Sequence, residues 1–197
     1  MPVFASGSGL TPAQEAAGLA AGKDNSKQYH LTWVYDTVEV VSASSTTTAN
    51  FFTSIDGKTW TQSNMRSASI LPGVRALTVA TILITHFDAT NGNVLATDLA
   101  ELGWGYFALF LRDRPQPDYV QTRLLCGGPG IVVGGSTTRG TFGNGTIANA
   151  LSFFDPFLTT IQGNEPFRGE MRWDTGITLT NTIEVTVALY GRGTREN

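Results

Sequence analysis

The chain has 197 residues, a formal net charge of −3 at pH 7 and only 15% charged residues, whereas ordinary soluble domains carry about a quarter. This length suits a single β-sandwich or barrel with a sizeable core, and the scattered Lys and Arg side chains argue against direct, sequence-specific nucleic-acid binding, which usually needs a basic stripe. The sole cysteine, Cys126, excludes an internal disulfide and a cysteine-rich zinc site, and we expect it to be a small buried hydrophobic residue.

Residues 1–27 are rich in Ala, Gly and Ser and predict an N-terminal arm with one short helix. Thr11 is a suitable N-cap, Pro12 suits the first helical position, Gln14 completes the capping-box spacing, and Gly22 suits the helix end. Because alanine buries little apolar area, this segment cannot hold a core by itself. We expect the arm to lie on a neighbouring molecule or on the edge of its own domain, and to contribute to assembly more than to stability.

The N-terminus has no basic region followed by an unbroken apolar run, so it does not resemble a secretory signal. The longest apolar runs are also shorter than the ~18–20 residues that span a bilayer. We therefore expect synthesis in a cytoplasm, the alternative being that a signal has been removed.

Residues 28–197 have a β pattern that predicts one sandwich domain. In the first strand, residues 28–41, apolar side chains occupy alternate positions and then slip by one residue. Such a slip is typical of a β-bulge. The alternation runs through Tyr29, Leu31, Trp33 and Tyr35, and continues at Val38 and Val40.

Further strands are separated by segments rich in Gly, Pro and Asn. The aromatic segment 103–113 predicts a strand that ends at a turn containing Pro115 and Pro117. The other predicted strands are 76–86, 120–126, 130–133, 148–154 and 167–173.

A short helix is predicted over residues 97–103, with Thr97 or Asp98 as its cap. Just before it, Asn91-Gly92 predicts a tight turn.

The last strand, residues 182–190, has the clearest pattern. Ile183, Val185, Val187 and Leu189 alternate with polar residues and alanine at strict period two, which predicts one buried face and one exposed face. The total is about eight strands with turn signals every ~8–12 residues, which is typical of an antiparallel sandwich or barrel.

The two histidines, His30 and His86, are the candidates for a catalytic base. His86 and Asp88 share one face of a predicted strand. No Gly-x-Ser-x-Gly elbow or other nucleophile signature accompanies them, and two histidines without a cysteine cluster argue against a zinc site.

Three other patterns resemble sites only in part. Residues 88–93 resemble a calcium loop, but the glycine falls at the fifth position and no glutamate closes it, so we interpret them as a hairpin turn. Residues 55–59 end like a phosphate-binding loop, but Phe52 stands where its first glycine must be. Asp98 and Glu101 share a helix face, as glycosidase carboxylates can, and we interpret them as solvated. The sequence thus predicts no catalytic, cofactor-binding or metal-binding residues.

The four tryptophans, Trp33, Trp60, Trp104 and Trp173, are expected in the core, the default for aromatic side chains in β-domains. A carbohydrate-binding sandwich would instead present two or three coplanar rings on one face, and the spacing shows no such arrangement.

Residues 51–72 carry four short motifs that lead into the strand predicted at 77–84: an aromatic pair, a G-K-T loop, an S-N-M turn and a Leu-Pro step. The positions are Phe51, Phe52, Gly57, Lys58, Thr59, Ser63, Asn64, Met65, Leu71 and Pro72. This segment resembles virion structural proteins of icosahedral tailless bacteriophages, those with an internal membrane included. Residues 187–195 resemble the closing strand and short basic tail of the same proteins.

The resemblance implies a single jelly roll that assembles into an icosahedral capsid, as a major coat subunit or as a minor, vertex or cement protein. The family's larger coat proteins carry two jelly rolls, and this chain has room for one. The implied partners are copies of the same chain, other virion proteins and, in membrane-containing phages, the internal membrane; the implied location is the virion. The low charge agrees, because interface cores are depleted in charged residues.

Two other classes of function stay open. A carbohydrate- or receptor-binding sandwich would be favoured by an exposed aromatic patch. A glycoside hydrolase would need two facing carboxylates in a cleft.

Overall fold

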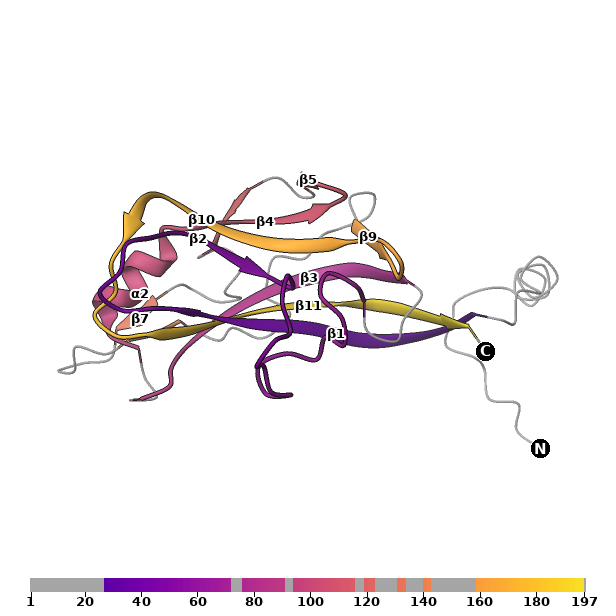
Figure 1. Ribbon diagram of the computed structural model, residues 1–197, viewed down its shortest axis with the longest axis horizontal. Helices are drawn as coiled ribbons and strands as arrows, with labels where there is room; N and C mark the ends of the chain where they lie inside the picture. The colour runs from indigo at the N-terminus through magenta and orange to yellow at the C-terminus, as the bar shows by residue number, and fades with distance from the viewer. Residues whose placement is uncertain are drawn as a thin grey trace, which may run out of the picture.

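A computed structural model shows two antiparallel sheets, of four and five strands, packed face to face as a sandwich (Figure 1). The described residues are 27–71, 76–90, 94–115, 119–122, 131–133, 140–142 and 159–196. Several predicted features lie outside them: residues 1–26 of the arm, the strand at 148–154, the Asn91-Gly92 turn, Pro117 and Cys126.

Sheet A, the lower layer in Figure 1, has the strand order β1-β11-β3-β9. Its strands are β1 (Lys27–Val40), β11 (Ile183–Glu196), β3 (Ala76–Asp88) and β9 (Thr159–Gln162). The predicted alternation of the last strand is confirmed, because all four of its apolar side chains from Ile183 to Leu189 are fully buried against sheet B.

Sheet B, the upper layer, has the order β2-β10-β4-β5, and β6 also pairs with β4. Its strands are β2 (Thr46–Phe51), β10 (Phe167–Ile177), β4 (Tyr106–Leu111), β5 (Arg114–Pro115) and β6 (Val120–Gln121). The turn after β4 comes earlier than the predicted proline turn. Arg112 and Asp113 occupy it, with φ angles of 48° and 63°, and positive φ at both central residues is typical of a two-residue hairpin.

Eight of these strands pair as though one long antiparallel hairpin had been rolled up. β1 pairs with β11, β2 with β10, β3 with β9, and β4 with β5, and successive pairs alternate between the two sheets. The contacts of β11 with β3 and of β10 with β4 then join the pairs within each sheet. This nesting is the jelly roll that the sequence predicts.

The bulge predicted in the first strand is wrong. β1 pairs with β11 in one unbroken register over Lys27–Val40. Val34, Asp36 and Val40 point into the core. Because a buried Asp interrupts the inward apolar alternation, the outward aromatic alternation imitates a buried face. The outward side chains are Leu31, Trp33 and Tyr35.

The bulge of sheet A lies in β3 instead. Ala80 is the extra residue there, because the register with β11 shifts between Tyr190 and Gly191. A Cβ at position 191 would collide with the carbonyl oxygen of Thr78, so the close approach of the two strands requires glycine.

The predicted short helix is present as α2 (Ala96–Gly103), at one end of the sandwich (Figure 1). Its predicted cap is wrong, because Leu95 occupies the N-cap position and no side chain makes a capping hydrogen bond. Strands β7 (Ile131–Val133) and β8 (Gly140–Phe142) form a separate two-stranded ribbon that contacts this helix.

Candidate functional site

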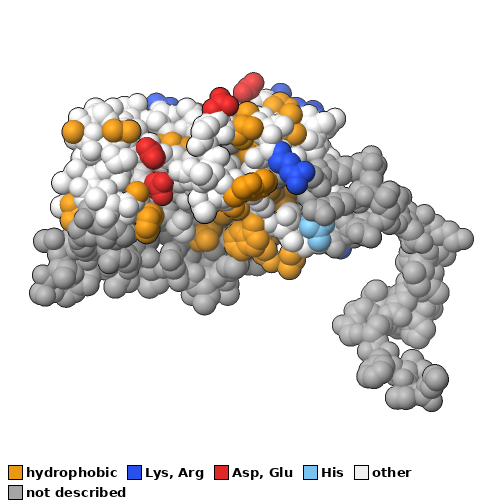
Figure 2. Space-filling model, turned by 60° about the horizontal axis from the view of Figure 1, so that its bottom comes forward, with side chains coloured by type: hydrophobic (Ala, Val, Ile, Leu, Met, Phe, Trp, Pro, Cys, Tyr) orange, Lys and Arg blue, Asp and Glu red, His pale blue; other side chains and the backbone are white. Residues whose placement is uncertain are grey.

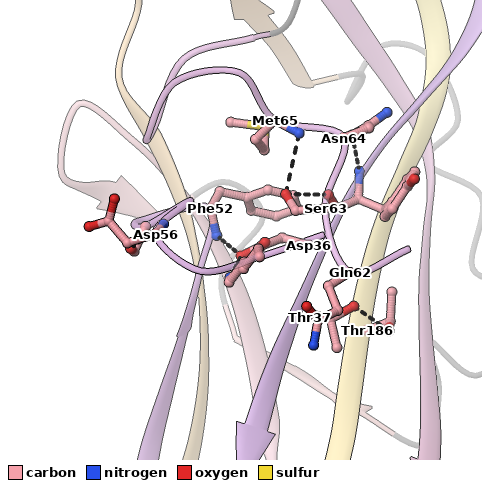
Figure 3. A network of polar contacts seen from close by, with 12 residues as sticks. Asp36, Thr37, Phe52, Asp56, Gln62, Ser63, Asn64, Met65 and Thr186 are labelled. Atoms are coloured by element: carbon pink, nitrogen blue, oxygen red, sulfur yellow. Dashed lines mark hydrogen bonds and ion pairs between the residues drawn. The ribbon is translucent and has the colours of Figure 1, made fainter. Parts of the chain in front are cut away.

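Residues 52–71 connect β2 to β3 and fold against the free edge of β1 (Figure 3). An unpaired edge is a template for unwanted strand pairing, so proteins usually cover it. Here the cover is a bridge between Ser63 and Asp36, together with the side chain of Asn64. This segment contains most of the motif residues quoted above.

Asn64 takes the place of a neighbouring strand. Its Oδ1 accepts a hydrogen bond from the Tyr35 N–H at 3.0 Å, and its Nδ2 donates to the Trp33 carbonyl at 2.8 Å. Ser63 Oγ donates to the Tyr35 carbonyl and accepts from the Met65 N–H. The S-N-M turn therefore satisfies backbone groups of β1 that would otherwise face solvent.

Asp36 anchors the same segment from within. Its side chain is fully buried and accepts a hydrogen bond from the Phe52 N–H at 2.6 Å. Lys58 Nζ lies 2.7 and 2.8 Å from its two carboxylate oxygens. Phe52 itself has φ of 65°, which is unfavourable for a bulky residue, so the Asp36 carboxylate holds a strained turn in place.

The remaining motif residues also have structural roles. Phe51, Phe52, Met65 and Leu71 are buried in the core, and Gly57 supplies a positive φ of 72°. Because Lys58 is paired with Asp36, the G-K-T loop is not available for phosphate. Pro72 lies outside the described residues.

The turn that carries Trp60 is held rigidly beside β1. The Gln62 and Ser63 N–H groups donate to the Thr59 carbonyl, and Gln62 Oε1 accepts from the Thr59 N–H. The Tyr35 hydroxyl donates to the Trp60 carbonyl. This bonding fixes the backbone while the indole of Trp60 remains 67% exposed.

Together these residues form an apolar patch on the outer face of sheet A, which we call the β1 patch. Trp33 and Tyr190 stack with ring centroids 4.4 Å apart and planes tilted by 40°, and Leu31 is 69% exposed. Figure 2 views this face and shows hydrophobic side chains gathered on it, with a Lys or Arg group and a histidine at one side of them. The β1 patch consists of Leu31, Trp33, Tyr35, Trp60 and Tyr190.

The outer faces of the two sheets differ in charge. On β11 the outward positions between Glu184 and Arg192 are uncharged: Thr186, Ala188 and Tyr190. On β10 of sheet B, by contrast, the outward positions are Arg168, Glu170, Arg172 and Asp174. Interface cores are depleted in charge, so the outer face of sheet A is the better candidate for burial against another molecule.

The histidines occupy separate places. His30 lies beside Gly193 on β11, where a Cβ would come within 3.0 Å of its Nε2. His86 points inward from β3 with both ring nitrogens buried, and this burial lowers its pKa to about 3. Asp88 accepts hydrogen bonds from the Asn181 amide at 3.0 Å and from the Thr90 N–H at 2.9 Å.

The sequence predicts that both carboxylates of α2 are solvated, and this prediction is wrong for Asp98. Asp98 is 2% exposed and accepts the N–H groups of Thr180 and Asn181 at 3.0 and 3.1 Å, which ties the helix to the turn before β11. Glu101 is exposed. The two side chains therefore face different surroundings and form no facing pair.

The core prediction for the tryptophans holds for Trp173, which is 2% exposed. It is wrong for Trp33, which is half-buried on the outer face of β1, and for Trp60 and Trp104, which are 67% and 62% exposed. Residue type alone carries no signal for this difference. Trp60 is exposed because it lies in the turn beside β1, and Trp104 is exposed because it lies at the end of α2.

No protein-family description, curated protein or solved structure matches this chain. Within the described ranges, no three His, Cys, Asp or Glu side chains gather as a possible metal site. In the same part of the chain, no helix has the length and apolarity needed to cross a bilayer.

We expect Asn64→Ala to lower the free energy of unfolding by about 1–3 kcal/mol, because the Tyr35 N–H and the Trp33 carbonyl each lose a partner. Urea unfolding measures this change. Arg66→Ala, at an exposed position of the same segment, should stay within about 0.5 kcal/mol of the wild type. Equal stabilities for the two variants would contradict the strand-like role of Asn64.

Proposed function

We propose that this chain is a capsid subunit that assembles with copies of itself through the outer face of sheet A. The observation that carries the proposal is the β1 patch, an exposed apolar surface on an outer face that is uncharged between Glu184 and Arg192. Exposed apolar patches of this kind are typical of protein–protein interaction sites. The jelly roll, an architecture shared by capsid and lectin domains, supports the same proposal.

The rigid attachment of the patch also supports assembly. Asp36 and Asn64 fix the segment that carries Trp60, and Tyr35 bonds directly to its backbone. A surface that is already ordered loses less conformational entropy when it docks. A shell subunit meets several neighbours at once, so modest contacts of about 800 Å² per partner combine into a stable whole.

We expect Leu31→Glu to weaken self-association at least about tenfold, because it places a charge in a contact that must exclude water. Stability should change by no more than about 0.5 kcal/mol, since the side chain is 69% exposed. Size-exclusion chromatography with light scattering, over a series of protein concentrations, measures the association.

Thr48→Glu is the matched control, because it adds the same charge at an exposed position of β2 in the other sheet. This variant should assemble like the wild type. A wild-type protein that stays monomeric at every concentration, or a Leu31→Glu variant that assembles normally, would overturn the proposal.

A further inference from the structure

A second exposed aromatic site lies on the other sheet, next to α2. Trp104 directly follows this helix and is 62% exposed. A shallow hollow of about 260 Å³ adjoins it, and a neighbouring hollow of about 230 Å³ shares Tyr106 and Asp174 with the first. Figure 1 shows α2 at the end of the sandwich opposite the end where β1 begins and β11 finishes. We call the two hollows together the Trp104 hollow, and their lining includes Glu101, Trp104, Tyr106, Tyr119, Arg172 and Asp174.

The local fold of β10 creates the hollow. Its pairing with β2 is irregular between Arg172 and Ile177, and such irregularities re-aim side chains beside binding sites. Trp173 packs inward there, with its Nε1 donating to the Leu102 carbonyl at 3.4 Å. Gly105 leaves room for that indole, because a Cβ would lie 2.7 Å from the same nitrogen. The buried Trp173 thus places its neighbours Arg172 and Asp174 on the outer face of sheet B.

The side chains of the Trp104 hollow combine flat apolar surfaces with hydrogen-bonding groups. The rings of Trp104, Tyr106 and Tyr119 offer faces against which C–H groups can pack. The carboxylates of Glu101 and Asp174 accept hydrogen bonds from hydroxyl groups, and Arg172 donates them. Pyranose rings present this combination, an apolar C–H face surrounded by hydroxyls. Two carboxylates against one guanidinium disfavour an anionic ligand.

The hollow is also partly preorganised. The Tyr119 hydroxyl donates to Glu170 Oε1 at 2.7 Å, and Arg168 Nη1 donates to Glu170 Oε2 at 2.9 Å, so the ring of Tyr119 is held in place. Each hollow is smaller than the ~300–1,000 Å³ of enclosed ligand pockets. Such a surface site suits the end of a glycan and not a fully enclosed small molecule.

We infer that the Trp104 hollow binds a neutral, hydroxyl-rich glycan, with one sugar ring stacked on Trp104 and its hydroxyls bonded to Asp174 and Arg172. This inference goes beyond shell assembly and does not rest on it, because the hollow and the β1 patch belong to different sheets.

The test uses saturation-transfer NMR and isothermal titration with the full-length protein. The probes are the tetraoses of glucose in β1,4 and α1,4 linkage and of N-acetylglucosamine in β1,4 linkage, together with β1,4-galactotetraose, at up to about 10 mM, which detects a Kd near 1 mM. We expect at least one of them to bind. Trp104→Ala and Asp174→Asn should each weaken that binding about tenfold or more, while circular dichroism stays unchanged.

Trp60→Ala is the matched control, since it removes an equally exposed indole from the β1 patch. It should keep the sugar affinity and reduce self-association. Trp104→Ala should instead lose sugar affinity and assemble like the wild type. The inference is overturned if none of the four tetraoses binds the wild type, if Trp104→Ala binds as tightly as the wild type, or if Trp60→Ala loses the affinity to the same extent. A Trp104→Ala variant that loses assembly but keeps sugar binding would also overturn it.

Discussion

Asp36→Ala is expected to lower the free energy of unfolding by about 3–5 kcal/mol, the cost of removing one partner of a buried ion pair. The change leaves the Lys58 ammonium without its counter-ion and the Phe52 N–H without its acceptor, at a residue whose backbone is already strained. A domain of this kind has only about 5–15 kcal/mol of stability in total. Urea unfolding measures the loss.

Asp56→Ala is the matched control, because it removes the same charge from an exposed position of the same segment. It should change stability by no more than about 0.5 kcal/mol. Replacing both partners, as in Asp36→Leu with Lys58→Met, should recover much of the loss, since no unpaired charge remains. If Asp36→Ala costs no more than Asp56→Ala, the carboxylate does not anchor the segment.

Acid is expected to destabilise the fold through His86. Burial lowers the pKa of this imidazole from 6.5 to about 3, so between these two pH values the unfolded chain binds a proton that the folded chain does not. As pH falls through this range, the free energy of unfolding drops by up to about 1.4 kcal/mol per pH unit, which amounts to a loss on the order of a few kcal/mol by pH 3. Above pH 6.5 the contribution is constant.

Urea unfolding at a series of pH values checks this result by comparing wild type with His86→Gln. The variant has no imidazole at position 86, so its stability should fall less steeply below pH 6.5, whatever its stability at neutral pH. Contributions from carboxylates are common to both proteins and cancel in the difference. His30→Gln keeps His86 and should keep the contribution of that residue. Parallel pH profiles for wild type and His86→Gln would contradict the burial argument.

Patterns that repeat within one strand were enough to predict the sandwich. Strict alternation over residues 182–190 reports a strand with one buried face, because successive side chains point to opposite sides. The low charge and the turn signals between strands point the same way. These are local properties, and β10, β11 and α2 lie close to where the sequence predicts them.

The orientation of β1 could not be predicted in the same way. Asp36 looks like a surface residue in the sequence, but in the structure it is buried and paired with Lys58. Lys58 is 22 positions away and reaches Asp36 because residues 52–71 fold against the edge of β1. With Asp36 inside, the aromatic side chains of β1 face outward. The β1 patch therefore goes together with a long-range ion pair that no periodicity shows, in addition to the buried Val34 and Val40.

The sequence by itself determined that the chain forms strands, where most of them lie and that they pack as an antiparallel sandwich, because alternation and turn chemistry act between neighbouring residues. Only the tertiary structure decided which tryptophan side chains are exposed. Trp60, Trp104 and Trp173 are the same residue type, and their exposure follows from contacts between distant segments, such as that of Trp173 with Leu102. Both candidate surfaces depend on such contacts, whose energies arise only after strands far apart in the chain have paired.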